Sequence, residues 1–258
     1  MFLSIITVVY NGEKTISRTI ESVLNQNFSD YEYIIQDGGS NDGTKSIVDF
    51  YIPKFKGKLK WYSEPDNGIY DAMNKGISHV TGQYIWLVNA DDYITSNAFQ
   101  EFYEYCEHNN FPKAVISGRM NVVDAITNKL YVTTHASNEF AFRKSCSNLK
   151  MGICHPATIV HRDVYEKIGT YDDRYFISAD LDFAIRCYRE SATVLFTDLV
   201  MTNMTDGGIS NRLPIKKCMH DCNLRAKKFC PNVFMRIAFK IWYFLRLLII
   251  KLRGYRYN

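Results

Sequence analysis

Apolar and polar residues along the first ninety positions follow a strand pattern and a helix pattern in turn. Continuous apolar or β-branched runs, which are typical of strands buried on both faces, occur at residues 3–9, 31–36, 59–63 and 85–88. Between them, apolar residues recur with helical spacing at residues 14–26, around residues 47–51 and at residues 69–80. This alternation with short turns predicts an α/β fold with a Rossmann-like, mainly parallel sheet flanked by helices.

The regular alternation weakens after about residue 115. The later pattern predicts a strand at residues 114–117, a hairpin made of residues 121–124 and 130–133, and a strand at residues 193–204. It also predicts a short helix at residues 162–168 and a longer one at residues 179–190.

Polar residues follow each of the first four predicted strands. They are Tyr10 and Asn11, Asp37, Asp66, and the run Asn89-Ala90-Asp91-Asp92. In a parallel sheet these carboxyl ends share one edge, where ligands bind. Two adjacent carboxylates at the end of a buried strand repel each other and lose hydration, and a divalent cation is the usual compensation. In the alternative interpretation, Asp91 or Asp92 caps a helix that begins near Ser96.

Two common nucleotide-binding motifs are missing from the sequence. No G-x-G-x-x-G follows the first strand, and no G-x-x-x-x-G-K-[ST] occurs, which excludes a P-loop. The sheet edge offers carboxylates instead, and a nucleotide diphosphate facing carboxylates must be bridged by a cation.

Four motifs in this order resemble the family 2 inverting glycosyltransferases, which have the GT-A fold. They are YN after the first strand, DGGSNDGT at residues 37–44, EPDNGIYDAMNKGI at residues 64–77, and YIWLVNADD at residues 84–92. The resemblance implies transfer of a sugar from a nucleotide-sugar, a UDP-sugar above all, with Mn²⁺ or Mg²⁺. It also implies that residues 1–115 bind the donor and that residues 116–211 bind the acceptor and complete the catalytic site of the same domain.

The resemblance also implies a set of site residues. Asp37 would bind the uridine with Tyr10 and Asn11 beside it, and NADD would be the metal-binding DXD element, with Asp91 and Asp92 as metal ligands. The full set implied to bind the donor is Val9, Tyr10, Asn11, Asp37, Gly38, Ser40, Asp66, Asn74, Lys75, Asn89, Ala90 and Asp91. Two residues depart from the family pattern, namely Asn89 in place of the first Asp and Met73 where many relatives carry Arg.

The segment YFISADLD at residues 175–182 resembles the family's ED-type motif, whose Asp acts as the general base. The resemblance therefore implies that Asp180 takes the proton of the acceptor hydroxyl. Asp180 could equally cap the following helix, and both roles are compatible. His155, in the segment CHP, either contacts the acceptor or has a structural role.

The C-terminal segment of residues 212–258 is basic, with twelve Lys or Arg against a single acidic residue, although the whole chain carries only +4. Residues 233–250 are apolar but contain Arg236, Lys240 and Arg246, which is unfavourable for a spanning helix. Cations on one half of the helical wheel and apolar residues on the other predict an amphipathic helix at an anionic membrane surface. Packing on the domain or on a partner subunit is the alternative. No nucleic-acid-binding module is recognisable, so nucleic acid is not expected as a partner.

The chain contains seven scattered cysteines and opens directly with a predicted strand. Both features are typical of a cytosolic protein whose thiols are reduced. Together with the tail and the family resemblance, this predicts a peripheral enzyme at the cytoplasmic face of the cell membrane. Its acceptor would be a glycan on a polyprenyl diphosphate carrier in bacterial surface-polysaccharide assembly. Two alternatives remain, a nucleotide-sugar-binding scaffold without turnover, suggested by Asn89 and Met73, and a polyprenyl-phosphate sugar synthase.

Overall fold

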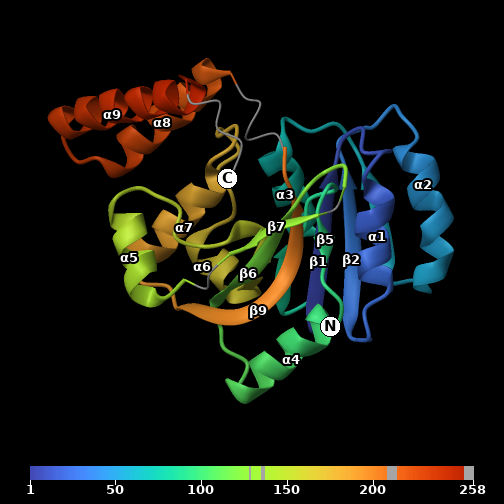
Figure 1. Ribbon diagram of the computed structural model, residues 1–258. Helices are drawn as coiled ribbons and strands as arrows, with labels where there is room; N and C mark the ends of the chain where they lie inside the picture. The colour runs from blue at the N-terminus through green and yellow to red at the C-terminus, as the bar shows by residue number, and fades with distance from the viewer. Residues whose placement is uncertain (128, 135–136, 208–213, 253–258) are drawn as a thin grey trace.

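The computed structural model describes residues 1–127, 129–134, 137–207 and 214–252. In this part of the chain the centre is a nine-stranded sheet (Figure 1) with the order β3-β2-β1-β4-β8-β6-β9-β5, and β7 pairs with β6. The strands are β1 Leu3–Val9, β2 Tyr31–Asp37, β3 Leu59–Ser63, β4 Tyr84–Leu87, β5 Tyr93–Ile94, β6 Val115–Val123, β7 Leu130–Thr133, β8 Thr158–His161 and β9 Val194–Thr205.

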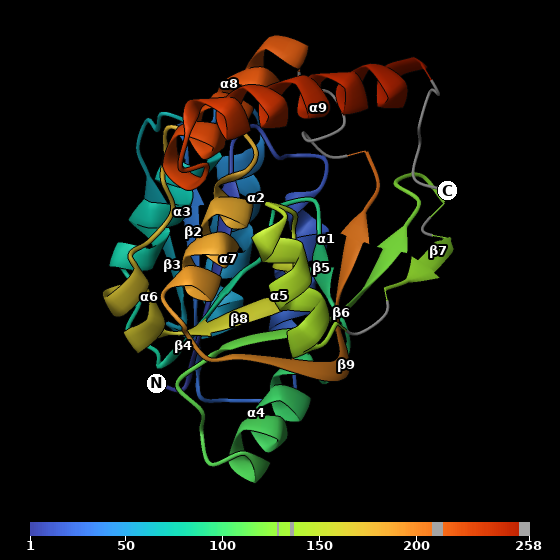
Figure 2. The same cartoon turned by 90° about the vertical axis from the view of Figure 1, so that its left-hand side faces the viewer.

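Helices follow the early strands and gather again in the C-terminal half. They are α1 Ile16–Leu24, α2 Thr44–Tyr51, α3 Ile69–Ser78, α4 Ala98–His108, α5 Glu139–Ser147, α6 Arg162–Ile168, α7 Ala179–Arg189, α8 Ile215–Phe229 and α9 Val233–Leu252, with two 3₁₀ turns, η1 Ile52–Phe55 and η2 His155–Ala157. In the view of Figure 2, α8 and α9 lie across the top of the molecule above α7.

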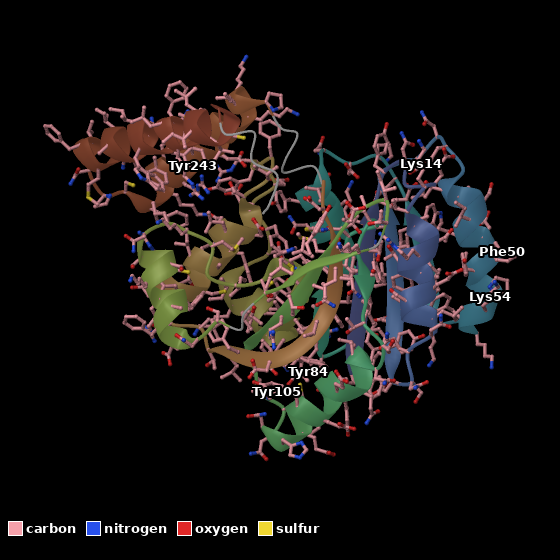
Figure 3. All side chains as sticks on the ribbon, viewed as in Figure 1. Lys14, Phe50, Lys54, Tyr84, Tyr105 and Tyr243 are labelled. Carbon is pink, nitrogen blue, oxygen red and sulfur yellow. The ribbon has the colours of Figure 1, made fainter. Side chains whose placement is uncertain are left out.

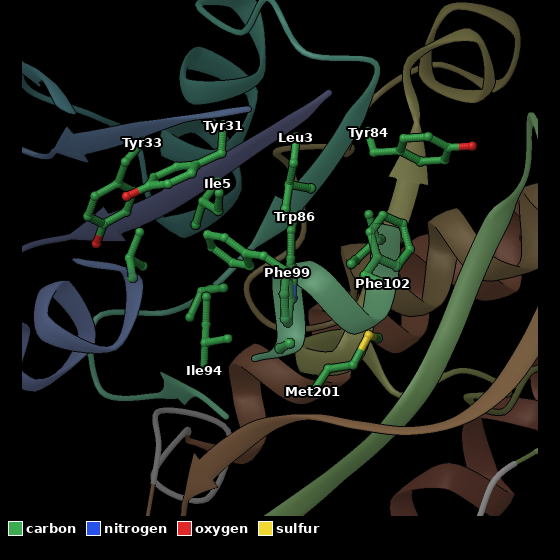
Figure 4. Packing of buried hydrophobic residues seen from close by; sticks show 14 of the residues in the cluster. Leu3, Ile5, Tyr31, Tyr33, Tyr84, Trp86, Ile94, Phe99, Phe102 and Met201 are labelled. Atoms are coloured by element: carbon green, nitrogen blue, oxygen red, sulfur yellow. The ribbon is translucent and has the colours of Figure 1, made fainter. Parts of the chain in front are cut away.

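Strand β1, in the interior of the sheet, is buried on both faces, and its alternate residues point to opposite sides. On one face, Leu3 and Ile5 of β1 pack with side chains of α1, α2 and α4 (Figure 4). On the other, Ile6 and Val8 pack with side chains of α3, α6 and α7. Both faces of β1 are therefore apolar, which explains its continuous apolar sequence.

The parallel pairing predicted for the first four strands of the chain, β1 to β4, is confirmed. β1 pairs in parallel with both β2 and β4, and β2 pairs in parallel with β3. The carboxyl ends of β1, β2, β3 and β4 therefore share one edge. Beyond β4, β8 runs antiparallel to its neighbours β4 and β6, which ends the regular alternation.

Several elements differ from the sequence prediction. The two strands expected at residues 114–117 and 121–124 are one continuous strand, β6, held between β8, β9 and β7. The first helix begins at Ile16 rather than residue 14, because residues 12–15 form a turn in which Gly12 O accepts hydrogen bonds from the amides of Thr15 and Ile16. The helices α5 and α8 were not predicted.

The C-terminal segment is divided between two helices. The inner face of α8 is buried on the domain, and α9 packs on α8, where the Arg225 guanidinium lies 4.9 Å from the ring centroid of Tyr243 (Figure 3). Most large apolar side chains of α9 are nevertheless exposed. Residues 212–213 and 253–258, which belong to the predicted tail, lie outside the described residues.

Candidate active site

One cavity of about 620 Å³ lies at the edge of the sheet where the strands β1 and β4 end. Turns after β1, β3 and β4, the 3₁₀ turn η2 and the start of α7 contribute side chains to its wall. Ten of the site residues expected from the sequence line it, namely Val9, Tyr10, Asn11, Asp66, Asn89, Ala90, Asp91, Asp92, His155 and Asp180. Its volume is in the range of sites that hold cofactor-sized ligands.

Asp37 does not line this cavity but lies beside its rim. The buried carboxylate accepts hydrogen bonds from the amide and hydroxyl of Ser40 and from the Ser63 hydroxyl, 2.6 Å away. A Cβ atom on Gly38 would lie 2.3 Å from Asp66 Oδ2 and 3.4 Å from Tyr10 Cδ2. The turn after β2 therefore packs directly against the cavity wall, and any side chain at position 38 would displace the Asp66 carboxylate.

The structure does not bring Asn74 and Lys75 into the cavity. The Asn74 amide donates to Tyr171 O at 2.8 Å and accepts from Tyr171 N at 3.0 Å. Lys75 Nζ donates to Pro65 O at 2.8 Å and lies 3.4 Å from Asp71. Both side chains hold neighbouring loops of the domain, whereas the buried Met73 side chain does line the cavity.

Asp91 and Asp92 have different surroundings. The Asp92 carboxylate is buried and accepts hydrogen bonds from Thr205 N at 3.0 Å and from Asn89 Nδ2 at 3.3 Å. The Asp91 side chain is half-buried on the cavity wall, where a ligand can reach its carboxylate. Asn89 helps to hold Asp92.

Burial raises the pKa of both carboxyl groups. The pKa of Asp92 rises to about 7 through burial and the adjacent charge of Asp91, against the opposing hydrogen bonds from Thr205 and Asn89. The pKa of Asp91 is raised by burial, and the Arg18 guanidinium partly opposes this. Arg18 itself is fixed to Asp91 O at 2.9 Å and to the Thr205 hydroxyl at 2.6 Å. The pair of carboxylates is therefore only partly compensated by the protein.

This partial compensation fits a divalent cation, which prefers oxygen ligands. In the described part of the chain, no group of three or more His, Cys, Asp or Glu side chains could hold a metal ion. The two aspartates would therefore supply few of the ligands, and diphosphate and water oxygens would complete the coordination.

Asp180 and His155 face the same cavity from the other side. Burial raises the pKa of Asp180, while His155, the Leu181 amide and the Tyr70 hydroxyl, 3.4 Å from Oδ1, partly offset the increase. Burial lowers the pKa of His155, and the charge of Asp180 partly opposes this. The His155 ring contacts the Tyr171 hydroxyl at 3.3 Å. The site thus combines a carboxyl group of raised pKa with a neutral imidazole.

Both capping alternatives are wrong. The helix α4 begins at Ala98 with Asn97 at its N-cap position, so neither Asp91 nor Asp92 caps it. The N-cap position of α7 is Ser178, and Asp180 lies inside the first helical turn. Asp182, in the same turn, is fully buried and bound to Arg186 at 2.8 Å and to Lys228 at 2.7 Å, which leaves Asp180 as the acid of this segment that lines the cavity.

The family model described as "Glycosyl transferase family 2" matches residues 4–169, well over half of the chain. The chain belongs to this family. A PGL/p-HBAD biosynthesis glycosyltransferase of Mycobacterium bovis is 29% identical over 218 residues, which are 83% of this chain and 81% of the relative. The chain is thus a glycosyltransferase, as the sequence motifs predicted.

Solved structures confirm the GT-A fold of this glycosyltransferase. Staphylococcus aureus TarS 1–349 in complex with UDP-GlcNAc superposes with a TM-score of 0.71 at 19% identity, covering 96% of this chain and 72% of that one. The mannosyltransferase PcManGT of Pyrobaculum calidifontis, in complex with GDP-Man and Mn²⁺, gives 0.61 at 17% identity and covers 89% and 64%.

Sequence reasoning missed several residues of the site. Thr205 and Arg18 hold the turn that carries Asp91 from 114 and 73 positions away in sequence, and no local motif marks such contacts. Tyr70 and Phe176 also line the cavity. Both lie within recognised motifs, Tyr70 four positions after Asp66 and Phe176 four positions before Asp180. An aromatic residue close in sequence to a candidate carboxylate was the available signal.

Proposed function

We propose that this glycosyltransferase transfers one sugar from a UDP-sugar to a hydroxyl of a lipid-linked glycan, with inversion at the anomeric carbon and dependence on a divalent cation. The observation that carries the proposal is the arrangement of Asp91 and Asp180 on the wall of a single cavity of about 620 Å³. Asp91 stands at the strand ends that form the donor side, and Asp180 stands at the start of α7. A diphosphate needs a carboxylate that can hold a cation beside it, and an attacking hydroxyl needs a base that can take its proton.

The chemistry follows from this arrangement. Asp180 takes the proton as the acceptor oxygen attacks the anomeric carbon, the new glycosidic bond forms, and the bond from that carbon to the diphosphate oxygen breaks. Attack from the side opposite the leaving group inverts the configuration. The raised pKa of Asp180 makes it a stronger base than a solvated aspartate, and it remains ionised only above that pKa.

Asp91, with Asp92 behind it, would hold the divalent cation. That cation would neutralise the charge that develops on the departing diphosphate. Asp37, Tyr10 and Asn11 would receive the nucleoside, since Asp37 is fixed beside the rim and Tyr10 is 64% exposed on the cavity wall. The complex of TarS with UDP-GlcNAc and that of PcManGT with Mn²⁺ support a donor and a cation of these kinds.

A panel of nucleotide-sugars tests the donor. UDP-GlcNAc, UDP-glucose, UDP-galactose and GDP-mannose would each be added with Mn²⁺, with Mg²⁺ or with EDTA, and the melting temperature measured. We expect a UDP-sugar to raise it only when the metal is present, because a ligand that binds the folded state stabilises that state. Equal shifts with EDTA would contradict metal dependence, and a shift by GDP-mannose alone would contradict the UDP preference.

We further propose that α9 binds an anionic membrane surface at the cytoplasmic face of the cell. In the described residues no helix is long and apolar enough to cross a membrane. Large apolar side chains of α9 are instead exposed along its length, among them Phe234 at 88%, Ile237 at 52%, Ile241 at 56% and Leu245 at 52%. Together with the cationic side chains of Arg236, Lys240 and Arg246, these apolar side chains can bind at the interface between the lipid headgroups and the acyl chains. A lipid-linked acceptor would then be presented at the same surface.

Replacing Phe234, Ile237, Ile241 and Leu245 with serine should abolish flotation of the protein with phosphatidylglycerol-containing vesicles. The apolar area that drives insertion would be lost while α8 remains in place. The matched control replaces Phe50 and Ile126, which are 64% and 91% exposed on other surfaces, and should float like the unmodified protein. Undiminished flotation of the α9 variant would overturn the proposal, and a shift from dimer to monomer instead would indicate a second copy of the chain as the partner.

A further inference from the structure

Two backbone amides in the segment that leads into α7 lie at the cavity wall and donate hydrogen bonds to a side chain of α8. Phe176 and Ile177 line the cavity, and Asp180 follows three residues after Ile177. Phe176 N and Ile177 N donate to the two carboxylate oxygens of Asp221, each at 2.9 Å. The Ser178 hydroxyl donates to Asp221 Oδ2 at 3.0 Å. One carboxylate of α8 thus holds three consecutive residues, two of which line the cavity.

Asp221 is well suited to this task. Its side chain is completely buried, and a buried carboxylate must be satisfied by several donors. The neighbouring residues of α8 hold the Phe176 ring, because the His220 ring lies 5.0 Å from it and Lys217 Nζ lies 4.7 Å from its centroid. The first half of α8 therefore fixes both the backbone and the aromatic side chain of this segment.

The second half of α8 is anchored to α7. Lys228 Nζ binds the buried carboxylate of Asp182 at 2.7 Å, and Arg189 donates to Phe229 O at 2.7 Å. Phe229 packs in a cluster with Leu181 and other side chains of α5 and α7. α8 is therefore a rigid support against which the segment before α7 is positioned.

We infer that Asp221 is a positioning residue for the acceptor side of the site, through which α8 sets the place of Asp180. The inference rests on the proposed function and adds a residue outside residues 4–169, which the family model matches. Loss of the three hydrogen bonds frees residues 176–178 to move, and displacement of a base by about 1 Å costs on the order of a hundredfold in rate. The donor side is built by the ends of β1, β2, β3 and β4, whereas Asp221 accepts hydrogen bonds from residues 176–178.

The test replaces Asp221 with asparagine, which keeps the shape but turns one acceptor into a donor that opposes the amides. UDP release from UDP-GlcNAc, UDP-glucose and UDP-galactose is measured with Mn²⁺ and water as acceptor, and UDP binding is measured separately. We expect kcat to fall about ten- to hundredfold, while the Kd of UDP changes less than about twofold. The pH at which activity appears should also shift, since the surroundings of Asp180 change. A purely structural loss would alter neither the pH profile nor kcat per folded molecule.

The control is Asp172→Asn, which removes a neighbouring carboxylate bound to Arg174 and Lys228 but leaves the segment of residues 176–178 untouched. It should keep the kcat and the pH profile of the unmodified protein. If Asp221→Asn does not fold, Ser178→Ala is the deciding variant. It removes one of the three hydrogen bonds, and although Ser178 stands at the N-cap position of α7, its side chain makes no capping hydrogen bond there. It should lower kcat severalfold. Unchanged kcat in folded Asp221→Asn, or in Ser178→Ala when the first variant does not fold, overturns the inference. No UDP release by the unmodified protein, with water or with lipid-linked glycans as acceptor, would instead refute the proposed function.

Discussion

Replacement of Asp180 with asparagine is expected to reduce sugar transfer by about 10²- to 10⁴-fold, the usual contribution of a general base. The amide has nearly the same shape, so its contacts with the Leu181 amide and Tyr70 should largely persist. UDP and Mn²⁺ should therefore raise the melting temperature of the variant as they raise that of the unmodified protein. Asp173→Asn, which changes an exposed carboxylate a few residues away, is the control and should remain active.

The dependence of transfer on pH should identify the same group. Burial raises the pKa of Asp180 above 3.8, the ordinary value for aspartate, and the base must be ionised to accept a proton. Activity should consequently increase with pH through a pKa above the ordinary value, and Asp180→Asn should lose that step. A variant that transfers sugar at nearly the unmodified rate, with the step intact, would show that another residue is the base.

Asparagine at position 91 should have the second large effect. We expect Asp91→Asn to lose the stabilisation that Mn²⁺ gives to UDP binding and to lower UDP release by more than about a hundredfold, since charge stabilisation by a metal contributes several kcal/mol. Asp92→Asn should be milder, about ten- to a hundredfold, as is typical of groups that support a metal ligand. Its new amide oxygen can still accept from Thr205 N, and the repulsion between two buried carboxylates disappears.

The comparison between these two variants decides which aspartate binds the metal. Isothermal titration of Mn²⁺ in the presence of UDP measures the affinity for each variant, and circular dichroism verifies that both are folded. The geometry of the two carboxylates predicts the larger loss for Asp91, because Asp92 already accepts hydrogen bonds from Asn89 and Thr205. A larger loss for Asp92 would reverse the assignment.

The arrangement of the first ninety residues could be predicted from the sequence because its information is local. Strands such as β1 are buried on both faces, so their apolar runs are continuous, and each polar strand end follows directly in the chain. Parallel pairing then brings these ends together at one edge. Seven of the residues found at these strand ends line one cavity, namely Tyr10, Asn11, Asp66, Asn89, Ala90, Asp91 and Asp92.

The part of the chain after residue 115 was predicted less well because its contacts are distant in sequence or polar. The inner face of α8 carries Asp221 and Arg225 among its buried residues, which breaks the apolar stripe by which an amphipathic helix is recognised. Residues 118–120 of β6 lack the strong apolar run that would have joined its two predicted halves.

Within the first ninety residues, the positions of two side chains were not predictable from the motif alone. Asn74 and Lys75 resemble donor ligands in the motif, but they donate hydrogen bonds to Tyr171 O and Pro65 O outside the cavity.

The most direct test of the central claim measures UDP release and the sugar-bearing product together. The unmodified protein and Asp180→Asn would each be incubated with a UDP-sugar, Mn²⁺ and lipid-linked glycans extracted from bacterial membranes. The proposed function predicts one UDP released for each sugar added by the unmodified protein, and almost none by the variant, although both bind UDP. Binding of the UDP-sugar without any release of UDP by the unmodified protein would contradict it and indicate a nucleotide-sugar-binding protein without turnover.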